Sequence, residues 1–180
     1  MATVNLIPNE NISNDWDYST GSSAFALLNQ DHTGTVATDA QYIKSSTADD
    51  DCIVGFTDFT EDHSAINSVQ AVLRVGNNNR GGSGRYAAEI QDSSGTLWSL
   101  ENSGLIAAQI NYVTETKTAR TTYNGSDAWT QSILNDIRMR INLSFIGGSG
   151  FSRVTYAYFI VDYDLPVAAA NNSIFFGTNF

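Results

Sequence analysis

Positive charge is scarce in this chain of 180 residues. Nine Lys and Arg stand against 19 Asp and Glu, which gives a net charge of −10 at pH 7. All charged residues together make up 16% of the chain, below the roughly 25% that is usual for globular proteins. Because phosphate binding depends on clustered Lys and Arg, this composition argues against nucleic acid as a partner.

Cysteine and long apolar runs are also nearly absent. The one cysteine, Cys52, excludes an internal disulfide framework and lies in the strand-like run CIVGF, so we expect a buried, inert thiol. No window approaches the ~18 apolar residues of a membrane span. The opening MATVNLIPNEN has neither the basic region nor the apolar run of a secretory signal. These absences predict synthesis and folding in a cytoplasm, without a membrane partner.

Aromatic residues (11%) and many Ser, Thr, Asn and Gly residues favour β-structure joined by turns. Strand-like segments recur along the chain, which is typical of an antiparallel sandwich or a barrel. They are Thr3–Ile7, Ala24–Asn29, Gln41–Ser45, Cys52–Phe56, Val69–Val75, Arg85–Gln91, Ala108–Thr116, Ile137–Phe145 and Val154–Tyr163. We therefore predict one β-domain over residues 20–165, an N-terminal arm over 1–19 and a C-terminal aromatic tail over 166–180.

The segment Ile137–Phe145 alternates strictly between apolar and polar residues, so one face of this strand should be buried. Arg138 and Arg140 share its polar face. On an edge or near-edge strand they can pair with surplus carboxylates, across strands or across subunits. The loop GGSG (residues 147–150) predicts a hairpin with Val154–Tyr163, which is apolar on both faces and should be central or covered by another segment.

Helix signals are weak. The best candidate is a short turn within DAWTQSILN (residues 127–135), where Thr130 could cap and Ile133 and Leu134 face inward.

Catalytic and metal signatures are lacking. His32 and His63 lie in polar, loop-like stretches, and no G-x-S-x-G motif occurs. Paired carboxylates of a glycosidase leave no sequence signature, so that option stays open. The acidic runs at Asp49–Asp51 and Asp58–Asp62 do not have the ligand spacing of a calcium loop. We predict no catalytic, cofactor-binding or metal-binding residues.

Five aromatic residues outside the predicted strands have two interpretations. They could stack on sugar rings, as in a carbohydrate-binding module, or fill the open ends of the sandwich, since tryptophan is usually buried. The second is our expectation. The five are Trp16, Tyr18, Trp98, Tyr123 and Trp129.

The tail SIFFGTNF concentrates large apolar residues after a small-residue stretch, AAANN. We predict that it binds a neighbouring subunit or another protein through Ile174, Phe175, Phe176 and Phe180. The alternative is that it folds back onto its own sandwich, over Val154–Tyr163.

Several segments, taken in order, resemble a family of small β-sandwich proteins encoded in the structural regions of tailed bacteriophages. In the first third these are LIPNENISNDWDYSTGSSAFALLNQ, ATDAQYIKSS and DDDCIVGFTDF; in the last third they are DAWTQSILNDIRMRINLSF and SRVTYAYFIVDY. The resemblance spans about Leu6 to Tyr163 and implies a jelly-roll-like sandwich in a virion, without known catalysis. It transfers no active-site residues.

The sequence thus predicts a non-enzymatic virion protein of a bacteriophage, made in the host cytoplasm. A capsid decoration (cement) protein is favoured, forming a homotrimer on the outer capsid surface and binding the major capsid protein. Arg138, Arg140 and the four tail residues are the predicted partner-binding residues. The alternative is a tail-fibre, receptor-binding or carbohydrate-binding β-sandwich, for which a glycan would be the partner.

Overall fold

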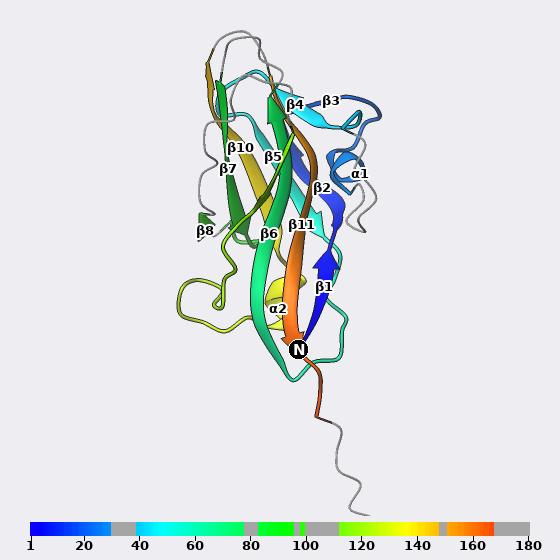
Figure 1. Ribbon diagram of the computed structural model, residues 1–180, viewed down its shortest axis with the longest axis vertical. Coiled ribbons are helices and arrows are strands. Elements are labelled where there is room, and N and C mark those ends of the chain that lie inside the picture. The colour runs from blue at the N-terminus through cyan, green and yellow to red at the C-terminus, as the bar shows by residue number, and fades with distance from the viewer. Residues whose placement is uncertain (30–38, 78–82, 96–97, 100–111, 148–150, 168–180) are drawn as a thin grey trace, which may run out of the picture.

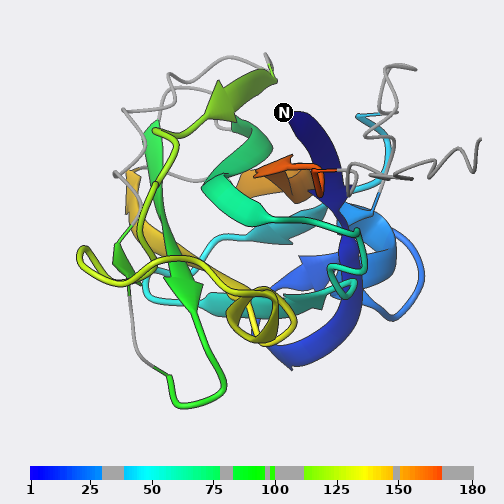
Figure 2. The same cartoon turned by 90° about the horizontal axis from the view of Figure 1, so that it is seen from below.

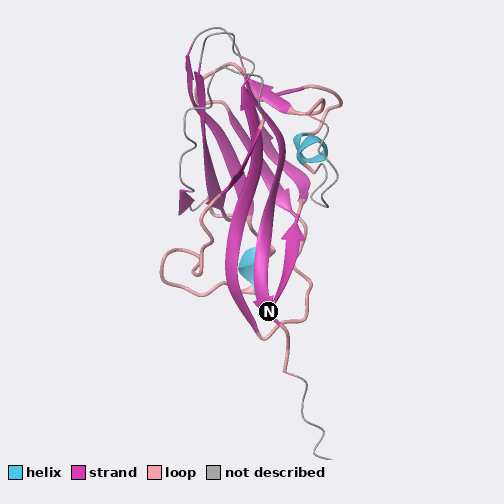
Figure 3. Cartoon of the chain, viewed as in Figure 1, coloured by secondary structure: helices cyan, strands magenta, loops and turns pink. Residues whose placement is uncertain are grey.

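The computed structural model describes residues 1–29, 39–77, 83–95, 98–99, 112–147 and 151–167. Two antiparallel sheets face each other, so the prediction of an all-β antiparallel sandwich is confirmed (Figures 1 and 3). Sheet A contains β1 (Ala2–Leu6), β3 (Asp17–Tyr18), β4 (Ile43–Ser45), β6 (Ala65–Asn77), β9 (Val113–Thr116) and β11 (Ser152–Asp164). Sheet B contains β2 (Pro8–Asn14), β5 (Asp51–Phe56), β7 (Ser83–Gln91), β8 (Trp98–Ser99) and β10 (Arg138–Gly147).

The core lies between the sheets and follows the alternation of the strands. Alternate residues are buried in β6 from Val69 onward, in β7 from Tyr86 onward and in β10 from Met139 to Leu143, as the pleat of a strand requires. Phe56 of sheet B meets Phe159 of sheet A with ring centroids 4.6 Å apart. The inward-facing residues of these three strands are Val69, Ala71, Leu73, Val75, Tyr86, Ala88, Ile90, Met139, Ile141 and Leu143.

β11 is a central strand of sheet A, as its two apolar faces predicted. The sheet order is β3-β4-β11-β6-β9, and β1 also pairs with β11. A β-bulge interrupts its pairing with β6 between Val154 and Tyr156, where Thr155 is fully buried. The extra residue reverses the alternation, so Val154 faces the core while Arg153 joins Tyr156 on the outer face.

The predicted hairpin between Ile137–Phe145 and Val154–Tyr163 is wrong. The two segments form β10 and β11, which belong to opposite sheets. β10 pairs with β5 and β7, whereas β11 pairs with β1, β4 and β6. Both strands have an apolar face, and crossing between the sheets buries those faces against each other, which a hairpin within one sheet would not do.

The helices are short. Residues Ala24–Leu28, predicted as a strand, form helix α1 instead, because Ser23 caps it and its run of Ala and Leu favours helix. Helix α2 (Gln131–Leu134) confirms the other prediction, with Thr130 as its N-cap. In the part of the chain that the structure describes, no helix has the length and apolar character to cross a membrane.

The predicted N-terminal arm, residues 1–19, instead supplies strands to both sheets. β1 pairs with β11 over five residue pairs, and β2 pairs with β5. β1 agrees with the strand-like segment Thr3–Ile7 predicted from the sequence, and Leu6 anchors it in the core. The tail beyond Val167 lies outside the described residues.

Two of the tryptophans fill the sandwich interior, as expected. Trp16 and Trp129 are 2% and 4% exposed, and each indole N–H donates to a backbone carbonyl, of Asp50 and Arg120 respectively. Seen from below, α2 and its flanking loop cross the open lower end of the two sheets (Figure 2). These tryptophans are therefore buried structural residues; the side chain of Trp98 is not described.

Candidate functional site

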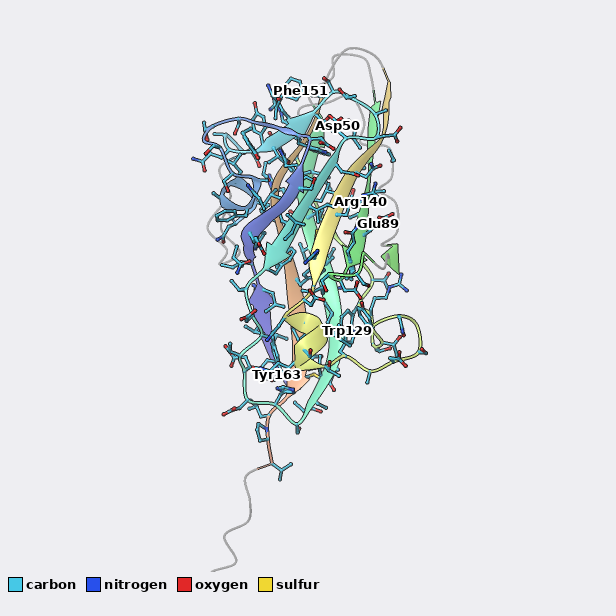
Figure 4. The ribbon with its side chains drawn as sticks, turned by 180° about the vertical axis from the view of Figure 1, so that it is seen from behind. Asp50, Glu89, Trp129, Arg140, Phe151 and Tyr163 are labelled. Carbon is cyan, nitrogen blue, oxygen red and sulfur yellow. The ribbon has the colours of Figure 1, made fainter. Side chains whose placement is uncertain are left out.

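One end of the outer side of sheet A gathers aromatic and cationic side chains. They come from β4, β6 and β11 and from the residues just before β4, β9 and β11. All of them are half-buried, which leaves part of each exposed. We call this set the outer aromatic face; its members are Tyr42, Lys44, Arg74, Tyr112, Phe151, Arg153, Tyr156 and Tyr158. Phe151 lies at the end of the molecule opposite Trp129 and Tyr163 (Figure 4).

Arg153 is the centre of this face. Its guanidinium carbon lies 4.2 Å from the ring centroid of Tyr42 and 4.5 Å from that of Phe151. The two rings are close to parallel, with an interplanar angle of 22° and centroids 6.5 Å apart. Lys44, the cross-strand neighbour of Arg153, adds a second cation 5.1 Å from the Phe151 ring. All three contacts are within cation–π range, so the rings and the cations hold each other in place.

Tyr112 connects Arg153 to the neighbouring strand. Its hydroxyl accepts a hydrogen bond from Nη1 of Arg153 and donates one to the backbone carbonyl of Asp39, each at 3.1 Å. The ring lies over Gly76 of β6, where a Cβ atom would come within 2.7 Å of it. Burial raises the pKa of Tyr112, which keeps this hydroxyl protonated and able to donate.

Arg74 is held by a carboxylate. Its Nε and Nη2 donate to the two oxygens of Asp39 at 2.8 and 2.9 Å, and these hydrogen bonds raise the pKa of Arg74. Its guanidinium also lies 5.6 Å from the centroid of the Tyr112 ring. Arg74 is therefore a rigid part of the face with its charge neutralised locally.

Tyr156 and Tyr158 extend the face along β11. Their ring centroids are 5.8 Å apart, and the Tyr156 hydroxyl lies 2.9 Å from the Thr114 hydroxyl. From Phe151 to Tyr158 the strand advances by seven residues, or about 20 Å at the usual rise of a β-strand. The arrangement offers a row of partly exposed rings with hydroxyl and guanidinium groups between them.

The opposite face of the sandwich carries the two arginines predicted from sequence. Arg140 donates to Asp51 at 2.6 Å and to Glu89 at 3.0 Å, one on each neighbouring strand, which raises its pKa (Figure 4). Arg138 lies 3.9 Å from Asp136. The predicted pairing with carboxylates is confirmed within the chain. The predicted edge position is wrong, since β10 is the middle strand of sheet B. Their role in binding a partner stays a prediction.

A buried charge cluster links the two sheets away from both faces. The Tyr86 hydroxyl and the Lys117 ammonium group both donate to Glu115 at 2.6 Å, and Lys117 is only 6% exposed. Burial, together with the hydrogen bond to Glu115, raises the pKa of Tyr86. Every charged group here has a partner within the cluster, so the contact between β7 and β9 leaves no member of the cluster unpaired.

Cys52 is confirmed as a buried thiol. Burial, and then the nearby carboxylates of Asp51 and Asp15, raise its pKa to about 12. The thiolate is the reactive form of cysteine, so this thiol is inert near neutral pH.

Two small polar pockets, of about 70 and 140 Å³, also occur, and the larger is lined in part by Lys44 of the outer aromatic face. The larger includes Asp15, Asp17 and Asp50, but Asp50 already accepts a hydrogen bond from Ser45. Among the described residues, no three His, Cys, Asp or Glu side chains come together as metal ligands.

His63 packs on Phe59 with its Nδ1 against the Glu61 carbonyl. His32 and the predicted tail residues Ile174, Phe175, Phe176 and Phe180 lie outside the described residues.

The fold and this surface define a class of protein: an antiparallel β-sandwich with a row of aromatic side chains on the outside of one sheet. No family model matches the chain, and no curated protein matches it. Among solved structures, it is similar to the C-terminal CBM6 of the laminarinase LamC from Zobellia galactanivorans. The identity is 10%, the TM-score is 0.49, and the match covers 89% of this chain and all of that one.

Two other solved structures show the same level of likeness. One is the K3 cleaved adhesin domain of Lys-gingipain from Porphyromonas gingivalis W83, with 10% identity, TM-score 0.49 and coverage of 88% of this chain and 99% of that one. The other is the CBM22-1 xylan-binding domain of Xyn10C from Paenibacillus barcinonensis, with 8% identity, TM-score 0.46 and coverage of 89% and 88%.

Proposed function

We propose that this chain is a non-catalytic carbohydrate-binding module whose outer aromatic face binds a glycan. The observation that carries the proposal is the row of partly exposed rings on β11 and its neighbours. The C–H faces of sugar rings are apolar and pack on aromatic faces, while sugar hydroxyls need hydrogen-bonding groups beside them. Tyr156, Tyr158 and Phe151 supply such rings, and Thr114 and Tyr112 supply hydroxyls next to them.

The geometry favours binding over hydrolysis. The carboxylates beside this face include Asp39, whose two oxygens already accept hydrogen bonds from Arg74. Asp15, Asp17 and Asp50 line a polar pocket together with Lys44. A glycosidase needs two carboxylates on opposite sides of one sugar bond, one of which is free to donate a proton. Asp39 is held as an acceptor and is therefore unsuited to that step.

The test is binding of the full chain to a broad glycan array, followed by calorimetry with the best ligand. Tyr158→Ala should weaken affinity by about tenfold, as for truncation of a central aromatic contact. Tyr123→Ala is the matched control, since this half-buried tyrosine packs against Trp129 rather than on the outer aromatic face. Absence of binding across the array, or equal losses in both variants, would refute the proposal.

The virion interpretation depends on the resemblance to phage proteins and on tail residues outside the described part of the chain. A decoration protein would bind purified phage particles, and a receptor-binding protein would bind glycans of the host surface. Its location on a capsid, the capsid-protein partner and the homotrimer stay predictions. A glycan-binding face is compatible with the alternative of a tail-fibre or receptor-binding sandwich.

A further inference from the structure

The glycan-binding end of sheet A holds two cations without carboxylate partners in a chain that has more than twice as many acids as bases. Of the cations whose side chains the structure describes, Arg74, Lys117, Arg138 and Arg140 form ion pairs. Among the same described residues, Lys44 and Arg153 pair with no carboxylate, although Asp17 is the cross-strand neighbour of Lys44. These two cations lie side by side on β4 and β11.

Arg153 also has unused hydrogen-bonding capacity. A guanidinium has five N–H donors, and the Tyr112 hydroxyl takes one of them, from Nη1. The Nε atom is shielded from solvent and has no partner within the described part of the chain. Because Nε is shielded, a ligand meets the terminal Nη1 and Nη2 groups of the half-buried guanidinium first.

Arg74 shows which acceptor suits such a guanidinium. The edge of its guanidinium formed by Nε and Nη2 holds both oxygens of the Asp39 carboxylate. In Arg153 the Nε atom has no partner among the residues that the structure describes, and the end formed by Nη1 and Nη2 is the edge on which a ligand carboxylate would bind. A guanidinium fork matches a planar carboxylate through two parallel hydrogen bonds.

We propose that the ligand is an acidic glycan, with the carboxylate of a uronic acid unit bound by Arg153 and Lys44 while the rings of Phe151 and Tyr42 flank it. This inference rests on the proposed carbohydrate-binding function and names the ligand class of the same site. A nucleic acid is the other polymer that combines negative charge with stacking groups. The net charge of −10 disfavours a polymer with dense phosphates, whereas the proposed site needs only one carboxylate placed beside Arg153 and Lys44.

The experiment measures binding of the full chain to polygalacturonate, alginate and hyaluronate, each alongside its methyl-esterified form, at fixed ionic strength. Esterification keeps the sugar backbone and removes the charge. We expect at least one acidic polymer to bind about tenfold or more tightly than its ester, the size of a hydrogen bond to a charged group. A sulfated polysaccharide and single-stranded DNA complete the panel, and both should bind more weakly than the acidic polymer.

The variants are Arg153→Met, which keeps an apolar stem between the rings, and Arg153→Lys, which keeps the charge but loses the fork. Arg138→Met on sheet B is the matched control, and a melting curve checks that each variant is folded. We expect both Arg153 variants to lose the preference for the acid over the ester, while Arg138→Met keeps it. If Arg153→Met does not fold, Arg153→Lys alone decides.

The outcomes separate this inference from the proposed function. Equal binding of acid and ester, with loss in Tyr158→Ala, refutes the acidic ligand and leaves carbohydrate binding intact. Stronger binding of the sulfated polymer or of DNA refutes the proposal that a carboxylate is the group bound by Arg153 and Lys44. Absence of binding to any glycan refutes both proposals.

Discussion

At the residue scale, the charges of this acidic chain are arranged as local pairs rather than as a uniform field. Arg140 bridges Asp51 of β5 and Glu89 of β7, so it neutralises two carboxylates that would otherwise face each other across β10. The sequence pattern correctly placed Arg140 on the polar face of its strand. It did not show that each neighbouring strand has an acidic residue within reach of Arg140. The bridge predicts that Arg140 contributes more to stability than an ordinary surface residue does.

Arg140→Gln should therefore lower the free energy of unfolding by about 1 kcal/mol, because it removes charge-assisted hydrogen bonds and leaves two acids opposite each other. Chemical denaturation checks this. Arg138→Gln is the control and should change stability by less than about 0.5 kcal/mol, since its contact with Asp136 is long and partly exposed. Equal effects of the two variants would show that the bridge adds nothing.

Cys52 gives a second prediction at this scale. Its thiol should not react with a disulfide reagent at pH 8 in the native protein and should react at once after unfolding. Because burial raises its pKa from 9.0 to about 12, the unfolded chain loses this proton first as the pH rises. The folded state then holds more protons, so the free energy of unfolding decreases between about pH 9 and pH 12.

The raised pKa of Tyr86 likewise lowers the free energy of unfolding as the pH rises into the alkaline range. Cys52→Ala should make the loss of stability above pH 9 less steep, as measured by denaturation at several pH values. Fast labelling of the native thiol at pH 8 would contradict the buried position.

At the scale of elements, the bulge in β11 decides which residues form the candidate site. If the strand alternated regularly through Thr155, Arg153 would lie on the same side as the core residues Ala157 and Phe159 and point between the sheets. With the bulge, Arg153 lies on the same side as Tyr156 and Tyr158. Gly76 of β6 also shapes the site, because the lack of a side chain at this position leaves room for the Tyr112 ring beside Arg153.

Gly76→Ala should displace the Tyr112 ring, since an added Cβ would lie 2.7 Å from an atom of that ring and the ring is anchored by its hydroxyl. We expect the variant to fold and to bind the glycan several-fold more weakly, measured by calorimetry. Gly55→Ala on β5 is the matched control: its Cβ would come 3.2 Å from the end of the exposed Glu10 side chain, which can move away. Unchanged affinity in Gly76→Ala would remove Tyr112 from the site.

At the scale of the whole molecule, the two sheets depend on each other and on both ends of the described chain. β1 near the N-terminus pairs with β11 near residue 164, and the Met1 amino group lies 3.6 Å from the Asp164 carboxylate. All strand pairings of the described residues end at or before Asp164. The pairings of the described residues therefore lie within residues 2–164.

A chain truncated after Val167 should keep its melting temperature within about 2 °C, since it loses no described pairing. If the tail binds a neighbouring subunit, the full chain associates and the truncated one is monomeric, as light scattering after gel filtration would show. Unfolding of the truncated chain would instead show that the tail belongs to its own sandwich.

The sequence by itself determined the fold class and most of the strands, because alternation between apolar and polar residues is a local property. It also predicted the buried thiol, the Thr130 cap and the buried tryptophans. Strand pairing was not predictable in this way: β10 and β11 each carry an apolar face, and only the packing of one sheet on the other decides that they lie in opposite sheets. The candidate site depends still more on tertiary structure, since a one-residue bulge turns Arg153 outward and brings together side chains from β4, β6, β9 and β11 that are far apart in the chain.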